Sequence, residues 1–194
     1  MGRLSEDLDL IAVGPRGQAA SRLDLELVRA VQRDYGLLTW RPPLSSIRDV
    51  ESASLMTSDG LTLRIQLLSA AYSDWPTEIR QLDQRYSDAP SAAMRVPTLP
   101  AFVAWKTTAW FERAAPRDLW DLWALAQIGA ITPEAATLFR QHGPTGAPPR
   151  PWMFRNPPSQ PQWEAQLGGQ THLDVSAKQA LHAVARAWHG SISE

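Results

Sequence analysis

The stretch Asp7-Leu-Asp-Leu-Ile-Ala-Val13, followed directly by Gly14-Pro15, sets the architecture of the first half of the chain. It is short and rich in β-prone residues, and the Gly-Pro pair ends it, so the pattern predicts a strand. Ser21-Arg-Leu-Asp24 resembles a capping box with Asp in the Glu position. Apolar residues then recur at helical spacing as far as Gly36, which predicts a helix after this strand.

Further strands are expected before residue 75. Leu37–Trp40 is a short candidate, and residues 46–57 and 61–69 flank Asp59-Gly60, a dipeptide favoured in hairpin turns. After about residue 75 the strand signal fades, and helices are expected over residues 98–113, 117–128, 132–142 and 174–188. The prediction is an α+β fold with a small mixed β-sheet in residues 1–75 and a helical lobe in residues 76–194.

Composition excludes several classes of protein. The formal net charge is −1, which argues against a strongly basic nucleic-acid coat. The absence of cysteine excludes disulfide scaffolds, thiolate zinc sites and a cysteine nucleophile. Of the 19 basic residues, only Lys106 and Lys178 are lysines, so a lysine in this arginine-rich chain is informative. No apolar run is long enough for a membrane span and the N-terminus lacks an apolar signal region, so we expect a cytoplasmic protein.

Asp7 and Asp9 are the first candidate site residues. On a strand their side chains point to the same side, and two such carboxylates can jointly hold a divalent cation such as Mg²⁺. The alternative is a solvated strand start, since Asp-x-Asp is a common pattern.

The segment Lys106–Asp121 is the second candidate. Lys106 lies on an otherwise apolar stretch, where an ammonium can hold a phosphate or extend its charged end to solvent. The alternative to a functional role is that Arg113 and Arg117 are ordinary surface charges. Asp118 would then stabilise the positive end of a helix that begins there. The tryptophans near this segment, Trp105, Trp110, Trp120 and Trp123, are expected to pack in the core rather than stack on bases.

Together the two segments resemble the AbiEii/AbiGii abortive-infection nucleotidyltransferase toxins, which belong to the polymerase-β-like nucleotidyltransferase superfamily. Arg3-Leu-Ser-Glu-Asp-Leu-Asp9 is similar to the family's Arg-Phe-Ser-x-Asp-x-Asp stretch. Lys106-Thr-Thr-Ala-Trp-Phe-Glu-Arg113 and Arg117-Asp-Leu-Trp-Asp-Leu122 are similar to its Lys-x-x-Ala-Leu-x-x-Arg helix and the Arg-Asp-x-x-Asp-Leu that follows. The resemblance covers residues 3–128.

The resemblance implies roles for these residues. Asp7 and Asp9 would bind the catalytic Mg²⁺ or Mn²⁺, and Lys106 would contact the phosphates of the NTP substrate. Asp121 would complete the active site, with Asp118 as second choice. The nucleotide-binding set would be Ser5, Lys106, Arg113, Arg117 and Asp118. A hydroxyl at the Ser5 position can be phosphorylated by the cognate antitoxin in relatives, and a phosphate there would repel both carboxylates and the triphosphate.

Two departures from the family pattern matter. The superfamily has a Gly-Gly/Ser turn that grips the triphosphate about ten residues before the Asp-x-Asp strand, and this chain starts six residues before Asp7. An upstream start codon, a remnant gene and a different mode of triphosphate binding all remain open. Relatives also carry Lys-x-Asp/Glu on a later strand, where this chain has Arg64-Ile-Gln66. Glu51 or Asp49 is the alternative third carboxylate, since Gln66 is a poor general base.

The leading hypothesis is a metal-dependent nucleotidyltransferase toxin of a toxin–antitoxin system that transfers NMP from NTP to an acceptor, the tRNA 3′ end by analogy with relatives. The implied partners are NTP, RNA and a cognate antitoxin, without a membrane. One alternative is a truncated or inactive relative that binds antitoxin or RNA. Another is a helical interaction module with an accidental match.

Overall fold

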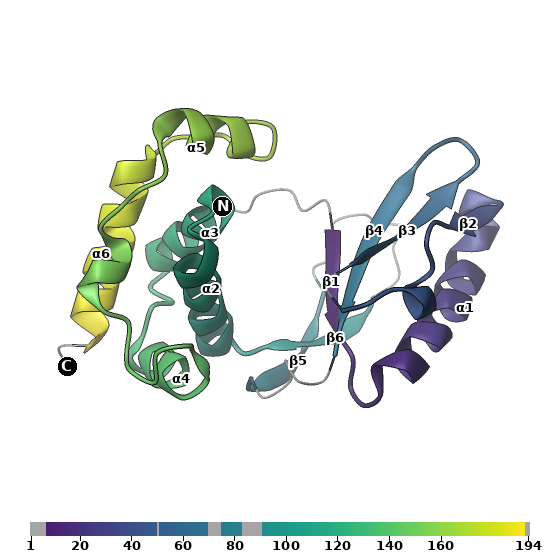
Figure 1. Cartoon of the computed structure of the whole chain (residues 1–194), viewed down its shortest axis with the longest axis horizontal. Helices are drawn as coiled ribbons and strands as arrows, with labels where there is room; N and C mark the ends of the chain where they lie inside the picture. The colour runs from purple at the N-terminus through teal and green to yellow at the C-terminus, as the bar shows by residue number, and fades with distance from the viewer. Residues whose placement is uncertain (1–6, 50, 70–74, 83–90, 193–194) are drawn as a thin grey trace. The chain divides into compact units, whose positions relative to one another are not determined.

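A computed structural model describes residues 7–49, 51–69, 75–82 and 91–192. The described residues form two compact units, one within residues 5–74 and the other within residues 75–194. The first holds a mixed sheet with one long helix and the second is mainly helical, as the α+β prediction requires (Figure 1). We refer to them as the sheet unit and the helical unit.

The sheet unit is a four-stranded sheet with the strand order β1-β4-β3-β2. β1 and β4 are parallel, while β4, β3 and β2 run antiparallel to one another. Gly60, in the predicted Asp59-Gly60 turn, has a φ of 95°, a conformation that favours glycine. The elements are β1 (Asp7–Ile11), α1 (Arg16–Tyr35), β2 (Leu38–Trp40), a 3₁₀ helix (Leu44–Ser46), β3 (Ser52–Thr57) and β4 (Thr62–Leu68).

α1 covers one face of this sheet (Figure 1). Leu8 and Leu10 of β1 pack with Ile65 and Leu67 of β4 against the apolar side of α1. Because side chains alternate along a strand, the odd-numbered residues of β1 and the even-numbered residues of β4 lie on the opposite face. Leu63, which by alternation lies on the same face as Ile65 and Leu67, is 42% exposed, so this burial is confined to the second half of β4.

The predicted capping box at Ser21 is wrong. α1 begins at Arg16, directly after Pro15, so Ser21 lies inside the helix. The carboxylate of Asp24 instead accepts hydrogen bonds from the backbone N–H groups of Leu44 (2.8 Å) and Ser45 (3.0 Å). Asp24 therefore ties α1 to the 3₁₀ helix, a contact between residues 20 positions apart that local sequence patterns do not report.

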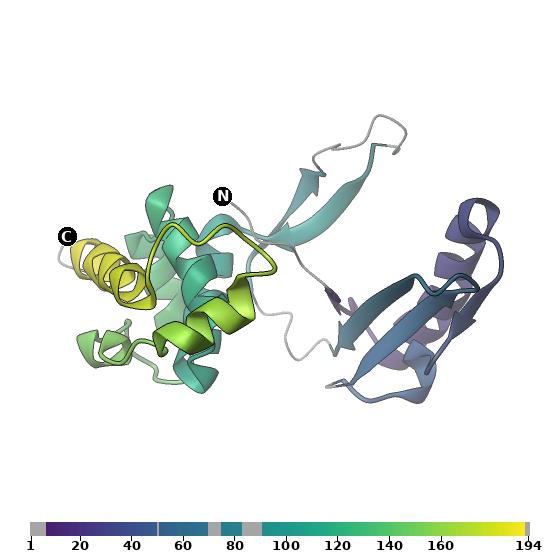
Figure 2. The same ribbon diagram turned by 90° about the horizontal axis from the view of Figure 1, so that it is seen from above.

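The helical unit begins with a two-stranded antiparallel ribbon, β5 (Thr77–Gln81) and β6 (Ala93–Pro97), which extends from the helices (Figure 2). The expectation that strands end near residue 75 is therefore wrong. The pairing joins segments more than ten residues apart, and neither strand shows a regular apolar alternation. The helices are α2 (Leu99–Arg113), α3 (Pro116–Gln127), α4 (Pro133–His142), α5 (Gln160–Leu167) and α6 (Ala177–Ile192), with a 3₁₀ helix at Pro151–Phe154.

Two helices of this unit begin where the sequence signals indicate. Thr98 and Thr132 cap α2 and α4, with each hydroxyl accepting from a backbone N–H three residues on (3.4 and 3.3 Å). The helix expected over residues 174–188 begins at Ala177, and the carboxylate of Asp174 pairs with His172 (2.9 Å). The hydroxyl of Ser176 accepts from the N–H of Gln179 (3.3 Å), and Gly190 lies within α6.

Tryptophans dominate the core of the helical unit. Trp110 and Trp120 are almost fully buried, and Trp105 and Trp123 are partly buried, so core packing is their main role. The indole N–H of Trp110 donates to the carbonyl oxygen of Met153 (2.9 Å), which ties the 3₁₀ helix Pro151–Phe154 to α2. Among the described residues, no helix is both long and apolar enough to cross a membrane.

We expect Asp24→Ala to lower the stability of the sheet unit by about 1–2 kcal/mol, because two backbone N–H groups lose their acceptor. Hydrogen exchange measured by mass spectrometry should show faster exchange of the segment around Leu44 and Ser45. Asp34→Ala is the matched control, because Asp34 lies at the exposed end of the same helix, 67% exposed. Equal exchange in the two variants would contradict this role for Asp24.

Candidate functional site

Asp7 and Asp9 lie on the face of the sheet opposite α1. Leu8 and Leu10 of the same strand are directed into the core under α1, so alternation turns both carboxylates to the other face. The side chain of Asp7 is 33% exposed and Asp9 is exposed. The carboxylates are therefore accessible from one side of β1, at the spacing predicted from the sequence.

β4 supplies the neighbours of these carboxylates. In the parallel register Asp7 lies beside Arg64 and Asp9 beside Gln66. The guanidinium of Arg64 forms an ion pair with Asp7 at 3.2 Å. The amide Nε2 of Gln66 donates to the backbone carbonyl of Asp49 (3.1 Å), which holds this side chain next to Asp9. Beside the two carboxylates, β4 thus places one cation and one neutral amide.

The donor set fits a hard divalent cation. Mg²⁺ prefers oxygen ligands and commonly binds one or two carboxylates plus waters and substrate phosphates, which is what Asp7 and Asp9 offer. Among the described residues, no group of three or more His, Cys, Asp and Glu side chains is placed to hold a metal. A cation bound by this pair would therefore need further ligands from water or substrate. Ser5, the hydroxyl assigned to the nucleotide, lies outside the described residues.

Neither alternative third carboxylate belongs to β3, which begins at Ser52. Glu51 accepts a hydrogen bond from the backbone N–H of Arg48 (2.8 Å). Asp49 accepts from the N–H of Ser69 (3.1 Å) and pairs with Arg16 (2.9 Å). The hydrogen bonds from Ser69, with the charge of Arg16, hold the pKa of Asp49 below its usual value. Asp49 and Glu51 thus serve as local anchors.

Lys106 of α2 and Asp121 of α3 form the first pair of the helical unit. The ammonium lies 2.7 Å from the carboxylate, and the two side chains are only 20% and 16% exposed. The ammonium also lies 5.5 Å from the ring centroid of Phe102. Partial burial strengthens this ion pair relative to an exposed one, and Asp121 therefore directs the ammonium that the sequence singled out.

Arg113 and Asp118 form the second pair, across the junction between α2 and α3. The guanidinium donates twice, from Nε (2.7 Å) and from Nη2 (2.8 Å), to the two oxygens of Asp118. Asp118 is fully buried, whereas the side chain of Arg113 is 49% exposed. This bidentate bond fixes the turn that brings Asp121 opposite Lys106. Arg117, in the first turn of α3, is exposed.

The sequence did not identify Arg64 as a candidate site residue. Arg64 was noted only as part of the Arg64-Ile-Gln66 stretch, yet it pairs with Asp7. Its position follows from the register of two strands separated by more than 50 residues. The spacing of Arg64 and Gln66 is a signal that both residues face the same way, but only the pairing of β1 with β4 identifies the carboxylates beside them.

The Arg113–Asp118 pair predicts an asymmetric loss of stability. Arg113→Ala should cost about 3 kcal/mol or more, because it leaves a buried carboxylate without its counter-charge. Asp118→Asn should cost about 1–2 kcal/mol, because the half-exposed Arg113 can be hydrated. Thermal and urea unfolding of the full chain measure both losses, and Arg117→Ala, which removes an exposed arginine, should cost less than about 0.5 kcal/mol. A larger loss for Asp118→Asn than for Arg113→Ala would contradict the interpretation.

Comparison with known proteins identifies the family of the chain. The model of one protein family, described as the nucleotidyl transferase AbiEii toxin of type IV toxin–antitoxin systems, matches residues 1–180. No curated protein and no solved structure matches the chain. The match spans β1 with its two carboxylates and the α2–α3 segment with both ion pairs, and the chain belongs to the AbiEii nucleotidyl transferase toxin family.

Proposed function

We propose that this protein is a metal-dependent nucleotidyltransferase toxin that transfers NMP from NTP to an RNA acceptor, the 3′ end of tRNA. The observation that carries the proposal is the pair Asp7 and Asp9 on the open face of the sheet. Family membership supports a nucleotidyltransferase with an NTP substrate and an antitoxin partner.

In the proposed reaction the acceptor hydroxyl attacks the α-phosphorus of the NTP. The new P–O bond forms while the bond to pyrophosphate breaks, and the hydroxyl proton is released. Asp9, the exposed carboxylate, can accept that proton, while the neutral Gln66 cannot. A divalent cation held by Asp7 and Asp9 would supply charge neutralisation for the triphosphate. The acceptor and NTP would approach from the face that carries both carboxylates.

Lys106 is the residue we assign to the nucleotide phosphates. Its ammonium is a point charge suited to phosphate, and Asp121 holds it at 2.7 Å in the structure. We assign Asp121 to the active site as the group that orients Lys106. Arg113 and Asp118 act indirectly in this proposal, by fixing the helix junction. Arg117, which is exposed, and Ser5 are candidates for direct nucleotide contact.

The decisive experiment incubates the full chain with labelled NTPs, Mg²⁺ and total RNA. We expect label in small RNA, and a loss of at least about 100-fold in Asp7→Asn, Asp9→Asn and Lys106→Met. The two Asn variants weaken binding of the cation that neutralises the triphosphate, and the Met variant removes the positive charge at the phosphates. Asp34→Asn, which changes an exposed carboxylate on α1, should retain activity. Absence of labelling by the wild-type chain, together with unchanged growth inhibition by Asp7→Asn, would refute the proposal.

A second candidate function is a catalytically inactive relative that binds antitoxin or RNA. Two observations favour it. Gln66, beside Asp9, is neutral where the family pattern has a carboxylate, and Arg64 forms an ion pair with Asp7, with which a metal cation must compete. Calorimetric titration separates the two candidates. Heat with Mg²⁺ and NTP supports the enzyme, and absence of heat with both supports the inactive relative.

Gln66→Glu should strengthen divalent-cation binding by about tenfold, because a third carboxylate then lies beside Asp9. Titration with Mn²⁺, followed by calorimetry, measures the change. Thr62→Glu is the matched control, because it adds the same charge to the same face of β4 two residues beyond Arg64. Equal gains in the two variants would indicate a general charge effect and contradict a site at Asp9.

A further inference from the structure

A hollow of about 480 Å³ lies in the helical unit between α6 and the segment around the 3₁₀ helix Pro151–Phe154. Its apolar floor includes Phe154 and Trp188, which are almost fully buried. Arg150, His182, Arg186 and His189 line it as well, and these four residues are exposed. The described lining contains no Asp or Glu, so basic side chains surround an apolar hollow.

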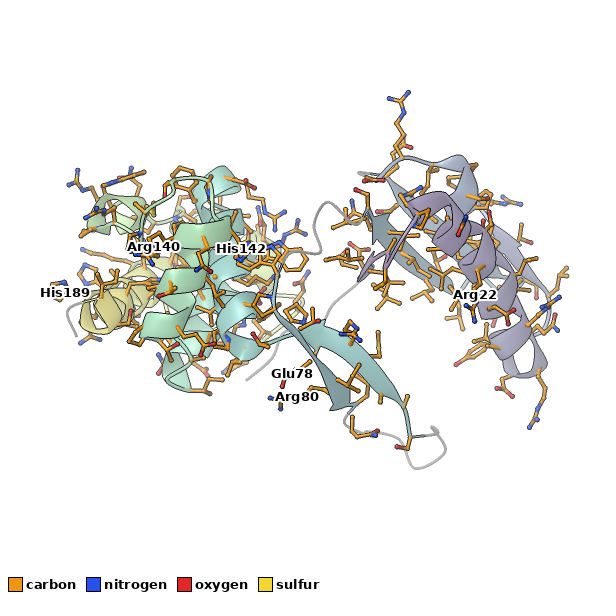
Figure 3. All side chains as sticks on the ribbon, turned by 90° about the horizontal axis from the view of Figure 1, so that it is seen from below. Arg22, Glu78, Arg80, Arg140, His142 and His189 are labelled. Carbon is orange, nitrogen blue, oxygen red and sulfur yellow. The ribbon has the colours of Figure 1, made fainter. Side chains whose placement is uncertain are left out.

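The basic residues continue along α6 as a stripe. The ionisable side chains of this helix are Lys178, His182, Arg186 and His189, with no acidic residue among them. At about 100° per residue these four positions fall within about 80° of one another, and they extend over about 16 Å of the helix. The other side of α6 is buried in the core through residues such as Leu181, Val184 and Trp188. Figure 3 places His189 on α6 at the surface of this unit.

This stripe includes Lys178, the second of the two lysines in the chain. The first, Lys106, belongs to the candidate site on α2 and α3. Lys178 is not among the residues assigned to that site. Most of the stripe also lies beyond residue 180, where the family match ends. The stripe and the hollow are therefore a feature separate from the residues assigned to nucleotidyl transfer.

We propose that the α6 stripe and its hollow bind single-stranded RNA. Lys178 and Arg186 place two cations on one helix face, and the imidazoles of His182 and His189 lie on the same face. This arrangement suits successive phosphates of a strand. The apolar floor suits one unstacked base, and a hollow of this volume is in the range of small-molecule sites. The positive charge of the stripe is complementary to a polyanion. The hollow can in addition hold a flat apolar group, which a simple anion lacks. The inference deepens the proposed function, because this strand is the acceptor RNA.

The test measures binding of a fluorescein-labelled 12-nucleotide single-stranded RNA to the full chain by fluorescence anisotropy, without NTP and with EDTA. Arg186→Gln should weaken binding about three- to tenfold and reduce the slope of log K against log salt by about 0.7, the share of one phosphate contact. Arg33→Gln is the matched control, because it removes an arginine that is 93% exposed on α1. Equal affinity of wild type and Arg186→Gln, or an equal loss in Arg33→Gln, would overturn the proposal.

Ala185→Phe tests the hollow separately, because Ala185 lines it and the substitution fills space without removing charge. Weaker RNA binding with an unchanged melting temperature supports insertion of a base, and unchanged affinity overturns it. Displacement of the RNA by polyglutamate at equal charge concentration would assign the stripe to an acidic polypeptide and overturn the RNA proposal.

The Asp7→Asn variant keeps this test distinct from nucleotidyl transfer. It should bind the RNA like wild type while losing transfer activity. If wild type transfers no nucleotide but its RNA affinity depends on Arg186, the binding inference stands and the proposed function fails. If Arg186→Gln transfers nucleotide and binds RNA like wild type, the proposed function stands and the binding inference fails.

Discussion

The two-residue alternation of β1 is the constraint on which the sheet unit depends. Leu8 and Leu10 have their apolar side chains under α1, so Asp7 and Asp9 must face the other way. A slip of one residue would bury two carboxylates against a helix without counter-charges, which is strongly unfavourable. The packing of the core and the exposure of the carboxylates therefore have a single cause, and α1 is as much a support of the candidate site as the strand itself.

In the helical unit, ion pairs rather than strand alternation position the candidate site residues. The buried carboxylate of Asp118 is compensated by the bidentate Arg113, and this bond sets the junction at which α3 leaves α2. Lys106 and Asp121 meet on the two helices that the junction joins. A row of charges in the sequence thus forms one pair with a fully buried carboxylate, Arg113–Asp118, and one pair that is partly exposed, Lys106–Asp121. The division follows burial, since a fully buried carboxylate has no route to a substrate.

Local signals in the sequence account for much of this fold. Thr98 and Thr132 cap the helices expected after them, Asp59-Gly60 forms the turn of the β3–β4 hairpin, and Asp7–Ile11 is the predicted strand. The errors share a cause. The β5–β6 ribbon depends on pairing across a long connection, and Asp24 caps a 3₁₀ helix 20 residues away instead of its own helix. Short-range patterns do not contain such contacts, because the partners meet only after the chain has folded.

The sequence by itself determined the type of each candidate residue, the alternation that turns Asp7 and Asp9 to one side, and the family signature around Lys106 and Asp121. Only the tertiary structure decided that Arg64 lies on Asp7, that Gln66 lies beside Asp9, and that Asp118 is buried under Arg113. It also decided that the basic residues of α6 border a hollow. The physical reason is that residue type and periodicity are local properties, whereas register, burial and ion pairing arise between segments brought together by the core.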